Sequence, residues 1–151
     1  MTARMDISTL QPASYRAMLG LDTRVHQGTL PKPLLELVKL RASQINGCVY
    51  CVDSHSTDAK AAGETDARLF GVAVWQDAPY FTDRERAALA LSEAMTRLPD
   101  AGVRVPDDVW DRAAEQFDEH GLAELVMVIA TVNAWNRICT ATRMVPASAE
   151  R

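Results

Sequence analysis

Apolar residues recur at helical spacing between residues 33 and 45, in the sequence PLLELVKLRASQI. The positions that carry this period are Leu34, Leu37, Val38, Leu40 and Ile45, as on one face of an amphipathic helix. Asn46 and Gly47 favour a stop after this helix. A second helix is expected from Cys48 to Gly63, because glycine adopts the left-handed conformation of a C-terminal cap without steric cost. Together the two segments predict an αα-hairpin.

Two further helices are expected after a short piece around residues 67–74. The segment 82–98 opens with Thr82 and Glu85 at the spacing of a capping box. Its apolar stripe consists of Ala88, Leu91, Met95 and Leu98. The segment 106–117 has a proline at its start and acidic residues in its first turn. Its expected inward positions are Val109, Trp110, Ala113 and Phe117.

A long apolar helix is expected after Gly121, in the sequence LVMVIATVNAWNRICTATRMV. Polar residues interrupt this region well short of the roughly 20 apolar residues that a bilayer needs, which favours a core helix. These polar residues are Glu124, Asn133, Asn136 and Arg137. No alternating run typical of a strand, no internal repeat and no linker is present in the sequence. The chain is therefore predicted to be a single all-α domain over residues 1–151.

The net charge and the N-terminal sequence argue against nucleic-acid-binding, membrane-surface and secreted proteins. The net charge of −4 gives neither the basic footprint of a nucleic-acid-binding protein nor the polybasic face of a membrane-surface protein. The first fifteen residues hold no apolar segment of the type found in a secretory signal. We expect a cytoplasmic protein, with neither nucleic acid nor a membrane among its partners.

Three cysteines, an odd number, argue against a structural disulfide framework in such a chain. Catalysis or metal binding is the more specific role expected for the pair Cys48 and Cys51. Cys139 stands apart in an apolar segment and is expected to be a buried, inert thiol, because free cysteine packs as a small hydrophobic residue. His26 and His120 have no thiol or carboxylate pattern around them and are expected to be surface residues in loops.

Cys48, Cys51 and His55 follow one another at spacings of three and four, which places them on one face of the predicted helix. Both thiols would lie in its first turn, where unpaired N–H groups and the helix dipole stabilise a thiolate. In a hairpin that turns near Gly47, Glu36 comes level with His55 within about one turn, at about 1.5 Å of rise per residue. A carboxylate there can orient His55 or take a proton through it.

Three other interpretations of these residues stay open at this point. The cysteines can be two packed thiols of a core helix, and Glu36 can be a solvated charge. Cys48, Cys51, His55 and Glu36 are also sufficient in number for a zinc site. Structural zinc usually draws on two separate pairs, however, and the chain has no second C-x-x-C or H-x-x-x-H pair. We therefore expect no metal and no other cofactor.

The stretch ELVKLRASQINGCVYCVDSHSTDAKAAGE resembles the alkylhydroperoxidase D (AhpD) family, within the carboxymuconolactone decarboxylase-like superfamily. The resemblance is carried by a glutamate twelve residues before the first cysteine, the C-x-x-C pair, a histidine four residues after it, and D-A-x-x-A-G-E. The segments FTDRERAALALSEAMTRL, VPDDVWDRAAEQF and LVMVIATVNAWNR are similar as well, so the resemblance covers nearly the whole chain. It implies an AhpD-like helical fold and a homo-oligomer, either a trimer or a hexamer.

By position, the resemblance also implies an antioxidant peroxidase that reduces organic hydroperoxides. Cys51 corresponds to the peroxidatic thiol and Cys48 to the resolving thiol. His55 corresponds to the proton relay and Glu36 to the base behind it. The implied electron donor is an external dithiol of the lipoyl or thioredoxin type. The decarboxylase branch of the superfamily lacks the cysteine pair, so decarboxylase activity is not expected.

Tyr50 departs from the best-studied branch of the family, which has a histidine directly before the second cysteine. A tyrosine there can donate a hydrogen bond to a substrate but does not shuttle protons near neutral pH. In the segment NAWNR, Asn133 is expected to line the site beside the hairpin, and loss of Trp135 to weaken folding or assembly. The alternative function is a redox-sensing or structural oligomer of the same fold, whose disulfide does not turn over.

Overall fold

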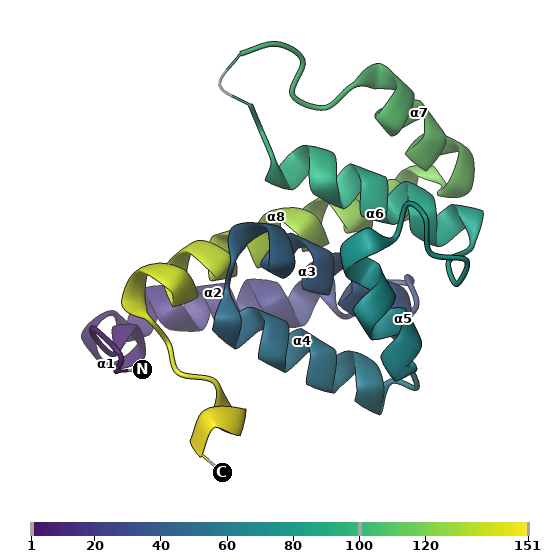
Figure 1. Ribbon diagram of the computed structural model, residues 1–151. Coiled ribbons are helices and arrows are strands. Elements are labelled where there is room, and N and C mark those ends of the chain that lie inside the picture. The colour runs from purple at the N-terminus through teal and green to yellow at the C-terminus, as the bar shows by residue number, and fades with distance from the viewer. Residues whose placement is uncertain (1, 100, 151) are drawn as a thin grey trace.

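The computed structural model describes residues 2–99 and 101–150, and within them every regular element is a helix (Figure 1). The α-helices are α1 (Ile7–Leu10), α2 (Pro12–Val25), α3 (Lys32–Asn46), α4 (Val49–Ala61), α5 (Asp66–Gly71), α6 (Asp83–Thr96), α7 (Asp107–Gln116) and α8 (Glu119–Thr142). Two short 3₁₀ helices are η1 (Val72–Val74) and η2 (Ala147–Glu150). The prediction of an all-α fold is confirmed.

Helices α3 and α4 form the predicted αα-hairpin near the centre of the molecule (Figure 1). Gly47 has a φ of 66°, in the left-handed region that favours glycine, and the Cys48 N–H reaches back to the Ser43 carbonyl at 3.0 Å. Cys48 is then the N-cap of α4, and its sulfur accepts a hydrogen bond from the Cys51 N–H at 3.3 Å. The helix therefore begins one residue later than predicted, and both cysteines lie at its N-terminus.

Helix α3 is enclosed on every side, because its side chains from Leu34 to Ser43 are all buried. It contacts α4, α6 and α8. Its charged residues must therefore find partners in the interior, where an unpaired charge is costly. Arg41 illustrates this, since its guanidinium lies 2.5 Å from the Glu93 carboxylate of α6.

Helix α6 begins with the predicted capping box, in which the Thr82 N–H donates to the Glu85 carboxylate at 2.8 Å. Two of the expected inward positions are wrong. Leu98 is 54 % exposed because α6 ends at Thr96, so this residue no longer follows the helical period. Trp110 is 43 % exposed because it lies on the outer side of α7, whose contacts are mainly with α6.

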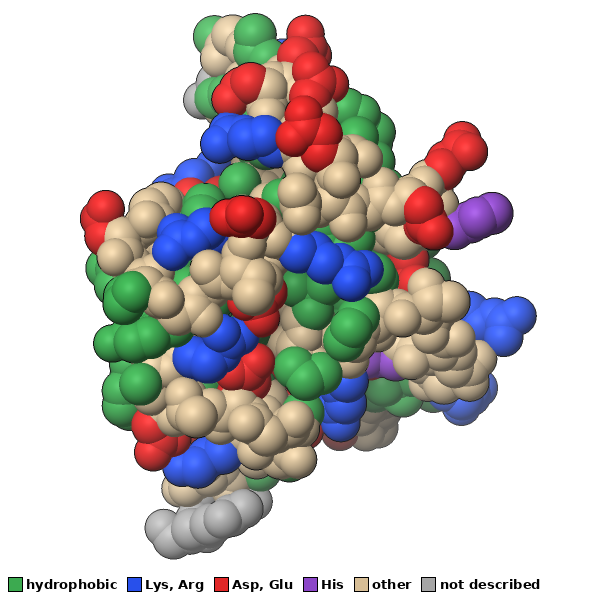
Figure 2. Space-filling model, turned by 90° about the vertical axis from the view of Figure 1, so that its right-hand side faces the viewer, with side chains coloured by type: hydrophobic (Ala, Val, Ile, Leu, Met, Phe, Trp, Pro, Cys, Tyr) green, Lys and Arg blue, Asp and Glu red, His purple; other side chains and the backbone are tan. Residues whose placement is uncertain are grey.

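Helix α8 runs alongside α3 and also contacts α2, α4 and α6. By length and composition alone the region Glu119–Ala149 is apolar enough to cross a membrane, a criterion that a core helix also meets. The buried side chains of α8 include Leu125, Ile129 and Val132, as expected for a core helix. Figure 2 shows the face on the right of Figure 1, where acidic and basic side chains are interspersed and neither sign forms a continuous surface.

The sequence analysis did not predict α1 and α2. Helix α2 buries only Val25, so it lacks the wide apolar stripe that marks a core helix. It contacts α8, and the segment that links it to α3 is held by Glu124. The carboxylate of Glu124 accepts hydrogen bonds from the Thr29 and Leu30 N–H groups at 2.8 and 3.1 Å. Tyr15, Leu19 and Asp22 of α2 line a cavity together with residues of α4 and α8, so α2 supplies one wall of the site described next.

Candidate active site

The two cysteines of the C-x-x-C pair are joined in a disulfide at the N-terminus of α4, with their Cα atoms 5.3 Å apart. Both residues are almost completely buried. Cys51 faces a cavity between α2, α4 and α8, whereas Cys48 lines a shallow depression on another side with Gln44, Val49 and Val52. The two cysteines thus border different hollows of the surface.

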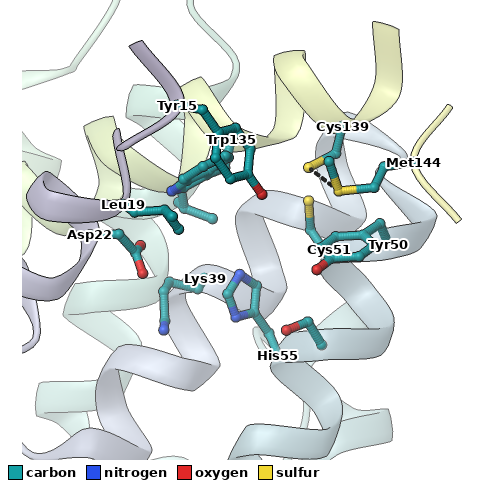
Figure 3. Close-up of a pocket in the computed structure, with 12 residues that line it drawn as sticks. Tyr15, Leu19, Asp22, Lys39, Tyr50, Cys51, His55, Trp135, Cys139 and Met144 are labelled. Carbon is teal, nitrogen blue, oxygen red and sulfur yellow. Dashed lines mark hydrogen bonds between the residues drawn. The ribbon is translucent and has the colours of Figure 1, made fainter. Parts of the chain in front are cut away.

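His55 and Glu36 meet across the hairpin, as the sequence predicted. The Nδ1 atom of His55 lies 3.1 Å from Oε2 of Glu36. Because an ionised carboxylate can only accept, Nδ1 carries the hydrogen of this bond and the neutral ring keeps Nε2 as a free acceptor. His55 stands one turn after Cys51 on the same face of α4 and lines the same cavity (Figure 3). His55 and Cys51 therefore face one cavity.

Glu36 has a second partner, the buried ammonium group of Lys39, at 2.7 Å. Burial alone would raise the pKa of Glu36, but the hydrogen bond from His55 and the charge and hydrogen bond of Lys39 outweigh it. The pKa of Glu36 is lowered on balance. Glu36 is thus an ionised carboxylate held in the protein interior, not the solvated charge of the alternative interpretation.

Lys39 also lies 2.6 Å from Nε2 of His26, a residue that the sequence analysis expected on the surface without partners. The other ring nitrogen, Nδ1, lies 2.6 Å from the Asp22 carbonyl, which can only accept, so Nδ1 carries a hydrogen. Nε2 then accepts from Lys39. His26 is exposed and lies in the turn after α2, as expected, but it also caps α2 and joins the Glu36 network through Lys39, which was not expected. His120 is exposed as expected, but it lies in the first turn of α8 and not in a loop.

The cavity beside Cys51 has a volume of about 160 Å³ and is lined mainly by apolar and aromatic side chains (Figure 3). Tyr15 and Leu19 come from α2 and Trp135 from α8, and the rings of Tyr15 and Trp135 meet edge to face with centroids 5.4 Å apart. Tyr50 forms part of the opposite wall. Burial raises the pKa of Tyr50, with a further contribution from the charge of Cys139. Its phenol therefore stays protonated and can donate a hydrogen bond into the cavity.

Cys139 lies at the same cavity and is not isolated from the other cysteines. It is a buried free thiol, as expected, but its Sγ lies within 4.8 Å of both Cys48 Sγ and Cys51 Sγ. Met144 adds a fourth sulfur, with its Sδ 3.8 Å from the Cys139 Sγ. Burial raises the pKa of Cys139 to about 11.

Asn133 is not among the residues that line this cavity, although the sequence analysis expected it to line the site. Its side chain is buried and fully engaged, because the amide group donates to Thr96 Oγ1 at 3.0 Å and the oxygen accepts from Asn46 at 2.9 Å. Asn136 accepts from the same Asn46 side chain at 2.8 Å and donates to Ser43 at 3.0 Å. The segment NAWNR thus packs beside the hairpin as predicted, but its amides tie α8 to the end of α3.

The four residues of the alternative zinc site do not form one cluster. Among the described residues, the side chains able to hold a metal fall into two separate groups. Glu36 and His55 lie with Asp58 in one, while Cys48 and Cys51 lie with Cys139 in the other. The zinc site as the sequence analysis framed it is therefore not formed.

Sequence reasoning missed Lys39, His26 and Cys139 as members of the site. Lys39 had a usable signal, since it follows Glu36 by one helical turn and interrupts the same apolar stretch. His26 and Cys139 come from other helices, so only the tertiary fold brings them to the hairpin. Their neighbours in the sequence carry no sign of this contact.

Comparison of the sequence with known proteins identifies the family of this chain. Residues 12–94 match the model of the carboxymuconolactone decarboxylase family. The uncharacterized protein YdfG of Bacillus subtilis is 36 % identical over 141 residues, which cover 93 % of this chain and 95 % of that protein.

Solved structures of other proteins share the fold of this chain. A protein of unknown function from Agrobacterium tumefaciens, for which a role as the antioxidant defence protein AhpD has been suggested, superposes with a TM-score of 0.91 at 30 % identity. The match covers 96 % of this chain and 98 % of that one. The debrominase Bmp8 superposes with a TM-score of 0.82 over 93 % of this chain and 75 % of its own. Its identity of 22 % shows a shared fold and no more.

Proposed function

The chain belongs to the carboxymuconolactone decarboxylase family, and we propose that within it the protein is a thiol-dependent peroxidase that reduces organic hydroperoxides. One observation carries the proposal: the Cys48–Cys51 disulfide lies beside a largely apolar cavity that also exposes His55, and His55 is hydrogen-bonded to the ionised, buried Glu36. A redox-active sulfur, a base and a binding space for an apolar molecule therefore occur together.

The first step forms the nucleophile. In the reduced protein, Nε2 of His55 takes the proton of Cys51 while Glu36 holds Nδ1 and stabilises the charged ring. The helix N-terminus and its unpaired N–H groups favour the resulting thiolate. Cys51 is assigned this role because it lines the cavity, whereas Cys48 does not.

The second step reduces the peroxide. The Cys51 thiolate attacks the terminal oxygen of the hydroperoxide, the O–O bond breaks, and the leaving alkoxide takes a proton from the His55 imidazolium to become an alcohol. Cys51 is then a sulfenic acid. The Tyr50 phenol, kept protonated by its raised pKa, is a suitable donor to the peroxide oxygen.

The third step restores the enzyme. The Cys48 thiol condenses with the Cys51 sulfenic acid, which gives the disulfide and one water. An external dithiol of the lipoyl or thioredoxin type then attacks Cys48 Sγ from the shallow side and releases the Cys51 thiolate. The second thiol of the donor completes its oxidation to a disulfide and frees Cys48.

The proposal includes a cytoplasmic setting, where thiols are kept reduced, and a single domain that assembles as a homo-trimer or hexamer. Exposed apolar side chains support assembly. Phe70 and Val74 are 77 % and 60 % exposed and lie one turn apart, which is a surface that association would cover.

A second function keeps the same chemistry without turnover: the disulfide acts as a redox sensor. Its support is the burial of both sulfurs, which slows a reductant, and the replacement of the family histidine by Tyr50. The two functions differ in whether a supplied dithiol restores the reduced pair rapidly.

The chemical step is tested by counting thiols. The reduced protein is mixed with one equivalent of cumene hydroperoxide, quenched with an alkylating agent under denaturing conditions and analysed by mass spectrometry. We expect loss of the Cys48 and Cys51 thiols with formation of their disulfide. A Cys51→Ser variant that consumes peroxide at the wild-type rate would overturn the proposed roles.

A further inference from the structure

We propose that the reduced protein binds a soft monovalent metal ion, Cu(I), through the thiolates of Cys48, Cys51 and Cys139, with the Met144 thioether as a fourth neighbour. The inference does not depend on peroxidase activity. It revises the expectation of a metal-free protein, and it rests on the cluster of four sulfur atoms that the fold assembles from α4, α8 and the segment after α8.

The spacing of the three thiols suits one ion. Their Sγ atoms all lie within 4.8 Å of one another. Three sulfurs that each lie about 2.3 Å from a common ion are separated by about 4 Å. Reduction breaks the bond between Cys48 and Cys51 and lets these two sulfurs move apart to that distance. Only small rotations of the three side chains are then needed to close the site.

The ligand type selects the ion. Thiolate sulfurs bind both Cu(I) and zinc, but a thioether is a ligand that suits Cu(I), whereas zinc completes its four ligands with further thiolate, imidazole or carboxylate groups. Among the described residues, no imidazole or carboxylate belongs to the group formed by these three cysteines. The atom that lies nearby instead is Met144 Sδ, at 3.8 Å from Cys139 Sγ. Among the described residues, this group of cysteines thus has no fourth ligand suited to zinc, but it has the Met144 thioether, which suits Cu(I).

The surroundings of Cys48 and Cys51 support negative charge on these two sulfurs. The Cys51 N–H already donates to Cys48 Sγ at 3.3 Å, and both sulfurs lie at the positive end of the dipole of α4. Burial keeps water from the ion, while the cavity that Cys51, Cys139 and Met144 share gives it a route from the surface (Figure 3).

Binding is tied to the redox state of the pair. The disulfide removes two of the three thiolates, so the oxidised protein cannot hold the ion in this way. A bound ion in turn blocks Cys51 as a nucleophile. Peroxide and Cu(I) therefore compete for the same reduced sulfur.

The experiment is an anaerobic competition for Cu(I) between the protein, reduced with a phosphine that is then removed, and a chromogenic Cu(I) chelator. We expect equimolar binding to the reduced protein and none to the oxidised protein. Cys139→Ser keeps the side-chain volume but removes the third thiolate. It should weaken binding at least about tenfold, because loss of even an outer partner of a metal ligand costs this much.

Two controls keep the result specific. Met127→Leu, on the exposed side of α8, should bind as the wild type does, and X-ray absorption of the loaded protein should show three sulfur neighbours or more. Wild-type affinity in Cys139→Ser, or two sulfur neighbours in the spectrum, would mean that the C-x-x-C pair binds alone and would overturn the proposal. Failure of the reduced wild type to compete with the chelator would also overturn it, without bearing on the peroxidase.

Discussion

Nδ1 of His55 lies 3.1 Å from Oε2 of Glu36, although the two residues are 19 positions apart in the chain. The hairpin brings them level, and the burial of α3 removes Glu36 from water so that its charge acts on His55 directly. The pair places a histidine with a buried carboxylate partner at the cavity that Cys51 also lines. Substitution of Glu36 therefore tests whether this carboxylate affects the reaction of Cys51.

Glu36→Gln should slow the reaction of Cys51 with cumene hydroperoxide by about 100-fold, the scale of a lost acid–base contribution. Glutamine keeps the shape of the side chain but cannot stabilise the charged form of His55. The rate of loss of the Cys51 thiol measures this. The matched control is Glu93→Gln, which removes another part-buried ion pair, with Arg41. A similar loss of rate in both variants would trace the effect to stability and not to the relay.

Lys39→Met should move the acidic limb of the pH–rate profile to higher pH. The charge of Lys39 helps to hold the pKa of Glu36 below its usual value, so its removal raises this pKa. The relay needs Glu36 ionised, and protonation then removes activity at a higher pH than in the wild type. The profile of kcat/KM against pH measures the shift. Lys60→Met, at an exposed ion pair with Asp66, should leave the profile in place.

Cys139 should be the slowest of the three thiols to alkylate in the reduced protein. Its pKa of about 11 leaves about one thiol in a thousand ionised at pH 8, and only the thiolate reacts. Timed labelling with iodoacetamide, followed by peptide mass spectrometry, gives the order. Labelling of Cys139 before Cys51 would contradict the assignment of Cys51 as the activated thiol.

Asn133→Ala should destabilise the protein by about 2 kcal/mol, because it leaves the buried Thr96 hydroxyl without this partner and removes one of the two hydrogen bonds that the half-buried Asn46 amide donates. The sequence analysis instead expected Asn133 to line the site. Urea denaturation measures the loss, and the rate of Cys51 oxidation serves as the control, which should change little. Unchanged stability with a slow Cys51 would restore the original expectation.

The parts of the fold that the sequence predicted are those set by local chemistry. Gly47 had to end α3 because the turn needs a left-handed residue, and the spacing of Cys48, Cys51 and His55 fixed their common face. Helix α2 was not predicted because Val25 is its only buried residue, so its sequence lacks the apolar stripe of a core helix.

The parts of the site that the sequence did not predict depend on contacts between distant segments. His26 reaches Lys39 across the link between α2 and α3, and Glu124 of α8 binds this link at Thr29. Cys139 lies close to the cysteine pair because α8 packs against the hairpin. In the same contact between helices, the Asn133 side chain accepts a hydrogen bond from Asn46 of α3. A helix face can be read from spacing, but which faces meet depends on how the helices pack.

The most direct test of the proposed function is steady-state consumption of cumene hydroperoxide with a supplied dithiol, dihydrolipoamide or reduced thioredoxin. The wild-type protein should consume many equivalents of peroxide per chain, while Cys51→Ser and Cys48→Ser should not turn over. Consumption that stops at one equivalent per chain with every dithiol supplied, or turnover that survives in Cys51→Ser, would contradict the assignment of this protein as a peroxidase.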